Sequence, residues 1–229
     1  MKKKLVVLTG AGMSAESGIA TFRDADGLWN KYRVEDVATP EAFEKDPELV
    51  LDFYNYRRRE LINAQPNAGH TGLVELEKDF EVHIITQNID NLHERAGSSS
   101  VMHLHGELMK ACSIHNLNKT YDLPPDNPDI HLGDTDPEGY QLRPFVVWFG
   151  EAVPMIEPAI EWVMQADILV VIGTSLNVYP AAGLLNYARK GVPVYLIDPK
   201  DVHTHRNDIH HIRMGASEGV KKLSKVLFL

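Results

Sequence analysis

The sequence contains a single cysteine, Cys112, among 229 residues. One cysteine cannot form an internal disulfide, so we expect a reducing, cytoplasmic environment. The single cysteine also excludes a zinc site built from three or four cysteines. Positive charge is in the minority as well, because 23 Lys and Arg stand against 32 Asp and Glu, for a net charge of −9. This balance argues against a nucleic-acid partner.

Long apolar runs are also missing. After the basic start MKKK, the first apolar run covers only Leu5 to Leu8, which is too short for the core of a signal peptide or for a membrane span. A hydrophobic content of 44% with 24% charged residues is ordinary for a packed globular domain. We therefore expect one globular domain over residues 1–229, neither secreted nor bound to a membrane.

Short apolar runs bounded by turn residues alternate with helical patterns along the chain. Buried strands are expected at Leu5–Thr9, Val82–Thr86, Phe145–Phe149, Ile168–Gly173 and Val192–Asp198. Helices are expected at Pro47–Ala64, His70–Lys78, Ile89–Ala96, Met155–Gln165 and Pro180–Lys190. Continuous hydrophobicity within a strand indicates that helices cover both faces of the sheet, as in parallel sheets. The sequence therefore predicts an α/β fold with a doubly wound parallel sheet.

Two stretches interrupt this alternation. Residues 24–64 contain polar turns and then a charged helix, and residues 110–142 are rich in Pro, Asp, Asn and Gly. A structureless stretch of that length is uncommon inside a compact domain. We expect these two insertions to form a small lobe, with the chain divided into a large lobe of about residues 1–30, 65–108 and 143–229 and a small lobe of about residues 31–64 and 109–142.

A glycine-rich loop directly follows the first strand. Gly10-Ala11-Gly12-Met13-Ser14-Ala15 matches the G-x-G-x-x-G/A dinucleotide pattern, with Ala15 in the third position. Gly10 would permit a tight turn and Gly12 the approach of backbone N–H groups to a pyrophosphate, ahead of a helix N-terminus. The acidic residue that dehydrogenases place about 20 positions later falls here in TFRDADGLWNKY, which does not resemble a strand end. Asp198 is a better ribose partner, or else only a turn residue before Pro199.

Further motifs follow in order along the chain. They are GAGMSAESGIATFRDADGLW (Gly10–Trp29), QNID (Gln87–Asp90), HLHG (His103–Gly106), FGE (Phe149–Glu151) and GTS (Gly173–Ser175). From about Leu5 to Ala216 this set resembles the bacterial sirtuins, which are NAD-dependent protein-lysine deacylases. The resemblance implies a Rossmann-type large lobe with a small lobe beside it. It also implies that NAD, consumed as co-substrate, and an acyl-lysine protein segment bind in the cleft between the lobes.

The resemblance implies that five regions of the chain hold NAD. The residues carried over are Gly10, Ala11, Gly12, Ser14, Ala15, Glu16, Ser17, Gly18, Thr21, Phe22, Arg23, Trp29, Gln87, Asn88, Ile89, Asp90, Gly173, Thr174, Ser175, Asp198, Pro199, Lys200 and Ala216. The chemistry agrees, because Asn88 and Asp90 can pair with the nicotinamide carboxamide and Arg23 with pyrophosphate oxygens.

His105 in HLHG corresponds to the family's general base, and a histidine can accept a proton near neutral pH. The implied reaction has two stages. The acyl carbonyl oxygen displaces nicotinamide from the ribose and forms an alkylimidate. His105 then takes a proton from the ribose hydroxyls so that the 2′-oxygen attacks, which leads to free lysine and 2′-O-acyl-ADP-ribose. His103, two residues earlier, is expected to be structural.

The helix LDFYNYRRREL carries Tyr54 and Arg57 three positions apart, which places them on one face. A phenol and a guanidinium that converge can bind a carboxylate. This spacing resembles the Tyr-x-x-Arg signature of the sirtuin branch that removes succinyl, malonyl and glutaryl groups. Arg58 and Arg59 are expected to face solvent. The alternative is an amphipathic surface helix whose arginines all face water.

Val147, Trp148 and Phe149, in FVVWFGE, resemble the family's strand along the acyl-lysine tunnel and would contact the substrate lysine. The alternative is that they are simply core residues of a strand.

Sirtuins usually carry two Cys-x-x-Cys pairs in the small lobe. Here Cys112 and His115 occupy the first pair, and the second falls near Thr135 and Glu138. Threonine is not a useful zinc ligand, so no structural zinc is expected and metal ligands are assigned to none of these residues.

Other functions stay open at this point: a protein ADP-ribosyltransferase, a catalytically idle NAD-binding sensor, or an NAD(P) oxidoreductase. The intact His105 and QNID segment argue against an idle module, and the missing early acidic residue argues against an oxidoreductase. The leading prediction is an NAD-dependent deacylase that removes succinyl, malonyl and also acetyl groups from protein lysines.

Overall fold

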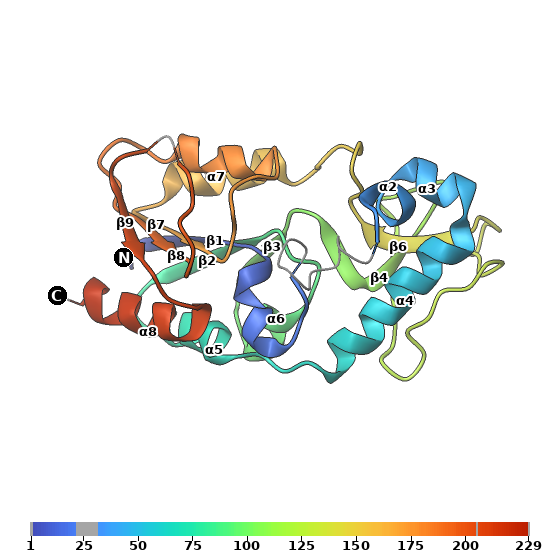
Figure 1. The fold of residues 1–229 in the computed structure, drawn as a ribbon, viewed down its shortest axis with the longest axis horizontal. Helices are drawn as coiled ribbons and strands as arrows, with labels where there is room; N and C mark the ends of the chain where they lie inside the picture. The colour runs from blue at the N-terminus through green and yellow to red at the C-terminus, as the bar shows by residue number, and fades with distance from the viewer. Residues whose placement is uncertain (1, 22–31, 205, 229) are drawn as a thin grey trace.

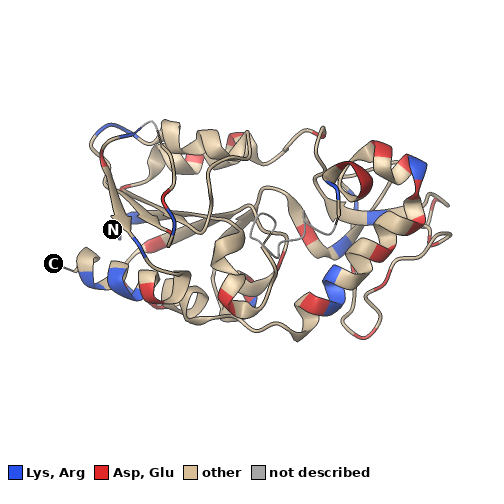
Figure 2. Ribbon diagram, in the orientation of Figure 1, with Lys and Arg blue, Asp and Glu red and all other residues tan. Residues whose placement is uncertain are grey.

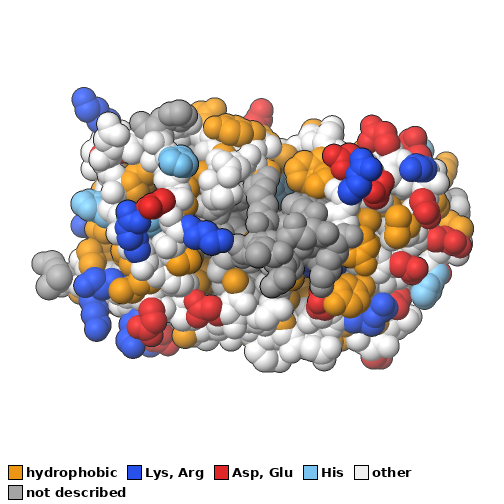
Figure 3. All heavy atoms as spheres, in the orientation of Figure 1, with side chains coloured by type: hydrophobic (Ala, Val, Ile, Leu, Met, Phe, Trp, Pro, Cys, Tyr) orange, Lys and Arg blue, Asp and Glu red, His pale blue; other side chains and the backbone are white. Residues whose placement is uncertain are grey.

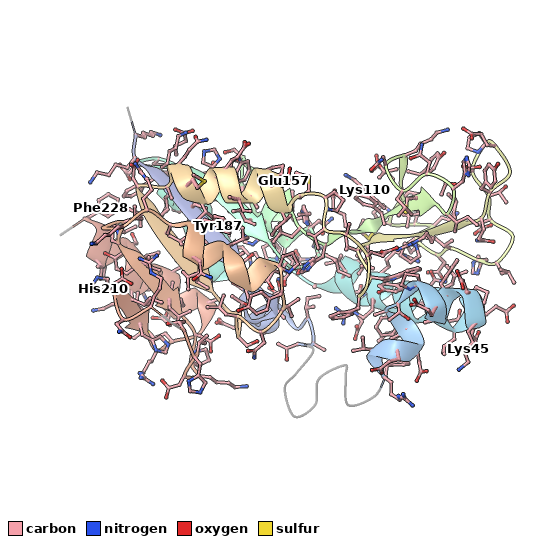
Figure 4. All side chains as sticks on the ribbon, turned by 90° about the horizontal axis from the view of Figure 1, so that it is seen from above. Lys45, Lys110, Glu157, Tyr187, His210 and Phe228 are labelled. Carbon is pink, nitrogen blue, oxygen red and sulfur yellow. The ribbon has the colours of Figure 1, made fainter. Side chains whose placement is uncertain are left out.

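The structure is a computed structural model that describes residues 2–21, 32–204 and 206–228. It has two lobes along its longest axis (Figure 1), with a six-stranded parallel sheet in the large lobe, in the order β3-β2-β1-β7-β8-β9, and a three-stranded antiparallel sheet in the small lobe, in the order β5-β4-β6. Seen from above, Glu157, Tyr187 and His210 lie on the large lobe and Lys45 and Lys110 on the small one (Figure 4). The expected α/β fold with a doubly wound parallel sheet is confirmed.

The large lobe is a sheet between two layers of helices. Its strands are β1 (Lys4–Thr9), β2 (Glu81–Thr86), β3 (Val101–His103), β7 (Ile168–Ile172), β8 (Val194–Ile197) and β9 (Ile209–Ile212). Its helices are α5 (Ala68–Leu76), α6 (Leu92–Ala96), α7 (Ile156–Gln165) and α8 (Ala216–Leu227), with the 3₁₀ helices η1 (Ala11–Met13), η2 (Ala15–Ser17) and η3 (Ala181–Tyr187).

Strand β1 shows why a continuous apolar run is needed. Val6 and Leu8 pack in the core beneath α7 and η3, whereas Leu5 and Val7 pack in the core beneath α5 and α8. All four side chains are at most 1% exposed. Because successive side chains of a strand point to opposite faces, a strand covered on both faces must be apolar at every position.

The small lobe combines helices with the antiparallel sheet. Its helices are α2 (Val34–Val37), α3 (Pro40–Lys45) and α4 (Pro47–Asn63), and its strands are β4 (Gly106–Ser113), β5 (Thr120–Asp122) and β6 (Leu142–Val146). Two expectations need correction. The strand expected at Phe145–Phe149 begins and ends three residues earlier and pairs with β4, outside the parallel sheet. Residues 110–142 are also not structureless, because β5 and the end of β4 lie within them.

Asn55 of α4 holds the long loop between β5 and β6. Its amide group donates to the carbonyl oxygen of Ile130 and accepts from the Ile130 N–H, each at 2.9 Å. Arg58 is fully buried and donates to the Asn55 side chain and to the carbonyl oxygen of Leu108 on β4. The expectation that Arg58 faces solvent is therefore wrong, since helix α4 packs against the sheet on that side. Arg59 is half exposed and pairs with Asp129 at 2.6 Å.

The four positions compared above with the two cysteine pairs have other contacts. Thr135 forms an isolated antiparallel β-bridge with Gln141. The Cys112 thiol contacts the carbonyl oxygen of Pro144 at 3.8 Å, and burial raises its pKa to about 11. His115 stacks on Tyr140, and Glu138 pairs with Lys119. In residues 2–21, 32–204 and 206–228 no group of three or more His, Cys, Asp or Glu is placed to hold a metal ion.

Several elements of the large lobe differ from the sequence prediction. The glycine loop continues into the short η1 and η2 rather than an α-helix, and Pro180–Lys190 forms the shorter 3₁₀ helix η3. Strands β3 and β9 and helix α8 were not predicted. Across the described part of the chain, no helix has the length and apolar character needed to cross a membrane.

His70 at the start of α5 connects this helix to the glycine loop. It is fully buried, its Nδ1 accepts from the backbone N–H of Asn67 at 3.2 Å, and the Asn67 amide donates to the carbonyl oxygen of Met13 and to the Ser17 hydroxyl. Its ring packs edge-on against that of His93, with ring centroids 4.8 Å apart. Burial lowers the pKa of His70 to about 4, and burial followed by repulsion from His70 lowers the pKa of His93.

We therefore expect the protein to lose stability as the pH falls from 6.5 to 4. In this window the unfolded chain protonates His70 and the folded chain does not, so each proton taken up favours unfolding, by about 3 kcal/mol in total for this residue. His70→Gln keeps an acceptor at the third helical position, where glutamine completes a capping box, and it removes the titration. Its unfolding midpoint in denaturant should change less with pH than that of the wild type or of His131→Gln, which alters an exposed histidine. Equal pH dependence in all three proteins would contradict this account.

Candidate active site

A cavity of about 610 Å³ lies at the carboxyl ends of the parallel strands and is lined by residues of both lobes. The loops after β1 and β7 meet there. From these two neighbouring strands the strand order proceeds outward through β2 to β3 on one side and through β8 to β9 on the other. Ligands of doubly wound sheets bind at this position. The size is also ordinary for a small-molecule site.

Glycines allow the loops after β1 and β7 to touch. A Cβ on Gly12 would lie 2.7 Å from Gly173 Cα, and a Cβ on Gly10 would lie 2.7 Å from Thr174 Cβ. Gly173 has a φ of +61°, and there is no room for a side chain at this position because a Cβ would lie 2.4 Å from Met13 N. The Gly12 N–H donates to the carbonyl oxygen of Gly173 at 2.8 Å. Gly12 therefore serves contact between the two loops, and its own N–H is engaged in that contact.

Most of the predicted site residues line this one cavity. Those lining it are Gly10, Ala11, Gly12, Ala15, Glu16, Thr21, Tyr54, Arg57, Gln87, Asn88, Ile89, His105, Val147, Trp148, Phe149, Gly173, Thr174, Ser175, Asp198, Pro199, Lys200 and Ala216. Ser14, Ser17, Gly18 and Asp90 do not line it. Phe22, Arg23 and Trp29 lie outside the described residues.

Asp90 and Ser14 support Asn88 from behind. The Ser14 hydroxyl donates to Asp90 Oδ2 at 2.8 Å, and Asn88 Nδ2 donates to the Ser14 oxygen at 3.1 Å. Asp90 Oδ1 accepts from the backbone N–H of Leu92. Both Asp90 oxygens are thus engaged, and burial raises the pKa of this carboxyl. This chain of bonds fixes the orientation of the Asn88 carboxamide, and Asn88 lines the cavity.

His105 has the geometry of a proton acceptor. Its Nδ1 lies 2.9 Å from the carbonyl oxygen of Gln87. A carbonyl oxygen only accepts, so Nδ1 carries the hydrogen and Nε2 holds the lone pair. Burial lowers the pKa of His105, which keeps the ring neutral at pH 7.

His103 lies outside the cavity lining. Its Nε2 is 2.7 Å from Glu94 Oε1 and its Nδ1 is 3.3 Å from the carbonyl oxygen of Asn88. Burial opposes ionisation of the ring, but the hydrogen bond to Glu94, the negative charges of Glu94 and Glu107 and the bond to the Asn88 carbonyl oxygen together outweigh it and raise the pKa of His103. These contacts agree with the expected structural role.

The far end of the cavity is formed by the loops after β8 and β9. Asp198 lines the cavity, and its Oδ1 also accepts from the Lys200 N–H at 2.8 Å, so it stabilises its own turn. Glu16 Oε1 accepts from the Ser217 N–H at 3.1 Å and ties η2 to the first turn of α8, which begins at Ala216. The carboxylates of Asp198 and Glu16 at this end suit the hydroxyls of a ribose.

Tyr54 and Arg57 enter the cavity from helix α4 of the small lobe. They are 4% and 5% exposed. Arg57 Nε lies 3.7 Å from Glu60 Oε2 on the same helix, and burial lowers the pKa of this guanidinium. Burial also raises the pKa of Tyr54 to about 12, so its phenol stays protonated. The alternative of a surface helix with all arginines in water is wrong for Arg57.

Val147, Trp148 and Phe149 follow β6 rather than forming part of it. The Val147 N–H donates to the carbonyl oxygen of His105 at 2.9 Å, and the Phe149 N–H donates to that of Ala38 at 3.0 Å. Trp148 is 3% exposed and Phe149 is 45% exposed. This segment therefore joins the two lobes beside His105.

Sequence reasoning missed part of the cavity wall. The residues that it did not assign are Ala38, Phe53, Val146, Gly150, Glu151, Val153, Asn177, Val178, Tyr179, Pro180, Ile197, Asp201, Val202, His203, Met214 and Gly215. Many of them lie in the loops that follow β7, β8 and β9. Because ligands of such sheets bind at the carboxyl ends of the strands, the predicted end of a strand could have indicated these residues.

Charge is distributed unevenly over the molecule. Acidic side chains gather on the small lobe over α2 and α3, and lysines gather on α8 at the opposite end (Figures 2 and 3). The acidic surface thus lies on the same lobe as Tyr54 and Arg57.

The chain is similar to known proteins over nearly its whole length. Residues 10–180 match the model of the Sir2 family. An NAD-dependent protein deacylase of Bacteroides thetaiotaomicron is 62% identical over 229 residues, with 98% of each chain covered. A protein of the same description from Helicobacter pylori strain 26695 is 54% identical, with 89% of this chain and 87% of the relative covered.

Solved structures show the same similarity. A mutant Sir2 homologue in complex with ADP-ribose superposes with a TM-score of 0.90 at 42% identity, covering 100% of this chain and 94% of the other. A Sir2 homologue in complex with NAD gives a TM-score of 0.85 at 43% identity, covering 99% and 91%.

The fold and the cavity thus define a nucleotide-dependent enzyme with its site between two lobes, and the chain belongs to the Sir2 family, the sirtuins. It is an NAD-dependent protein deacylase. The donor set fits NAD, because two residues with carboxamides, Gln87 and Asn88, and two with hydroxyls, Thr174 and Ser175, line one cavity.

Proposed function

We propose that this enzyme removes acyl groups that end in a carboxylate, succinyl and malonyl ahead of acetyl, from protein lysines. The observation that supports this preference is the position of Tyr54 and Arg57, both buried in the wall of the cavity that also holds His105. A carboxylate placed between a protonated phenol and a guanidinium gains charge-assisted hydrogen bonds, whereas an acetyl methyl gains none.

Each group of cavity residues has an assigned part in this proposal. Gln87, Asn88 and Ile89 contact the nicotinamide end of NAD, with Ser14 and Asp90 as supports. Gly173, Thr174, Ser175, Asp198, Pro199, Lys200 and Ala216 hold the phosphates and the adenosine. Phe22, Arg23 and Trp29 complete the NAD site in the family pattern. NAD supplies the ribose carbon that accepts the acyl oxygen once nicotinamide leaves.

The chain itself supplies proton transfer and exclusion of water. His105 Nε2 accepts a proton from a ribose hydroxyl, and the bond from Nδ1 to the Gln87 carbonyl oxygen keeps the ring in the accepting tautomer. Val147, Trp148 and Phe149 cover the lysine stem. The released products are nicotinamide, lysine and 2′-O-acyl-ADP-ribose, and the acidic small lobe favours targets with basic residues around the lysine.

Nicotinamide release separates this activity from ADP-ribosyl transfer to protein. We expect release from NAD to require an acyl-lysine peptide, with the acyl group recovered by mass spectrometry on ADP-ribose. Release with an unmodified peptide, together with ADP-ribose attached to protein, would support the transferase instead. Release of nicotinamide with neither peptide nor transfer would contradict both.

A further inference from the structure

Trp148 lies directly against Tyr54 in the cavity wall. Its indole Nε1 is 3.0 Å from the Tyr54 hydroxyl oxygen, and the two side chains are 3% and 4% exposed. An indole nitrogen is only a donor, so the Tyr54 oxygen is the acceptor in this bond. The hydroxyl hydrogen of Tyr54 is therefore excluded from the side that faces Trp148 and is available to an acceptor in the cavity.

The indole of Trp148 is itself fixed by its neighbours. The Arg143 guanidinium lies over the ring, 3.3 Å from its centroid, and the Trp148 backbone N–H donates to Glu151 Oε2 at 2.7 Å. The same carboxylate accepts two hydrogen bonds from Arg143, at 2.7 and 3.1 Å. Phe43 packs on the ring, with centroids 5.3 Å apart. A buried bidentate pair holds a definite geometry, so the indole has little freedom to turn away from Tyr54.

Arg143 is not a second cation for the substrate. Its guanidinium is 6% exposed, donates to both oxygens of Glu151 and also donates to the carbonyl oxygen of Val146 at 2.8 Å. It does not line the cavity, whereas Arg57 does. The Arg143–Glu151 pair therefore acts on the site through the position of Trp148.

We propose that Trp148 is a specificity-determining residue whose indole N–H orients the Tyr54 hydroxyl, so that its hydrogen is donated to the carboxylate of an acidic acyl group. This inference rests on the proposed preference for such groups. Tyr54 alone could donate in more than one direction, and Trp148 removes the unproductive one before the substrate arrives. An acetyl group has no carboxylate and gains nothing from that orientation.

The test is a double-mutant cycle with Trp148→Phe and Tyr54→Phe, read on one peptide that carries either succinyl-lysine or acetyl-lysine. Trp148→Phe keeps an aromatic ring and removes the N–H. We expect it to lower the ratio of kcat/KM for succinyl over acetyl about fivefold, through a higher KM for the succinyl peptide, and Tyr54→Phe to lower the ratio about tenfold. If Trp148 acts through Tyr54, the double variant should have the same ratio as Tyr54→Phe alone.

Two results would overturn the inference while leaving the proposed function standing. In one, Trp148→Phe keeps the wild-type ratio although Tyr54→Phe loses it. In the other, Trp148→Phe lowers the ratio equally in the wild-type and Tyr54→Phe backgrounds, which would show a packing effect. A wild-type enzyme that does not favour succinyl would instead overturn the proposed function. If Trp148→Phe does not fold, Arg143→Met releases the indole clamp and should lower the ratio in the wild-type background and not in Tyr54→Phe. An equal fold reduction in both backgrounds, or no reduction in either, would overturn the inference.

Discussion

Arg57→Met will lower the kcat/KM ratio of succinyl-lysine over acetyl-lysine about a hundredfold. The guanidinium is buried in the cavity wall, where a carboxylate partner is poorly screened by water and two charge-assisted hydrogen bonds contribute about 3 kcal/mol. Methionine keeps most of the aliphatic volume and removes the charge. Kinetics with NAD and the two acyl forms of one peptide measure the ratio directly.

The helix itself supplies a matched control for this change. Arg59 lies two positions further on, is half exposed and pairs with Asp129, away from the cavity. Arg59→Met should therefore keep the wild-type ratio, while Arg57→Lys should fall between wild type and Arg57→Met because an ammonium lacks the planar fork. If Arg57→Met and Arg59→Met have the same ratio, the proposed carboxylate site is wrong, and an equal lowering in both would show that only the net charge of the helix matters.

His105→Ala is expected to lower kcat by a factor of about 10² to 10⁴, the usual contribution of a positioned general base. Binding of NAD to the variant, measured by calorimetry, should persist because the described carboxamides and hydroxyls of the site are intact. His210→Ala, which alters an exposed histidine on β9, serves as the control. Near wild-type kcat in His105→Ala would show that another group accepts the proton.

The pH dependence of the wild type follows from the same residue. Burial lowers the pKa of His105 below its ordinary value of 6.5, so the ring becomes protonated, and loses its function as a base, only below that pH. The acidic limb of kcat/KM should thus have its midpoint below pH 6.5. A midpoint above 7 would contradict a buried neutral imidazole.

Much of the fold could be predicted because the sheet interior leaves a strong pattern. Strands β1, β2, β7 and β8 are covered on both faces and were predicted close to their observed bounds. Strand β3 has only three residues, and β9, with the sequence IHHI, has two histidines at its centre. Neither segment carries a run long enough to indicate a buried strand.

Helix α8 left a signal that was not used. Ala216, Val220 and Leu223 are buried on one face of it, at helical spacing. Gly219 interrupts the sequence pattern because its Cβ would lie 2.1 Å from Ile197 Cγ2, so the glycine permits close packing of the helix on β8. Such a contact is visible only once the helix and the strand are placed together.

The candidate site shows the same limit. The motifs named many residues of the cavity and included Ser14 and Asp90 among the NAD residues, but they did not show that these two lie behind Asn88, and they gave Arg143 no role behind Trp148. Arg57 and Arg58 are adjacent in the sequence and both buried, yet one lines the cavity and the other bonds to Asn55. Only the packing of α4 against β4 separates their roles.

The central claim is tested most directly by the wild-type enzyme on one peptide sequence with succinyl-lysine, acetyl-lysine or unmodified lysine. Nicotinamide release from NAD gives kcat/KM for each. The account predicts the highest value for succinyl-lysine, a lower value for acetyl-lysine and no release above background with unmodified lysine. A higher value for acetyl-lysine would contradict the acidic-acyl site, and Tyr54 and Arg57 would then be residues of an ordinary deacetylase.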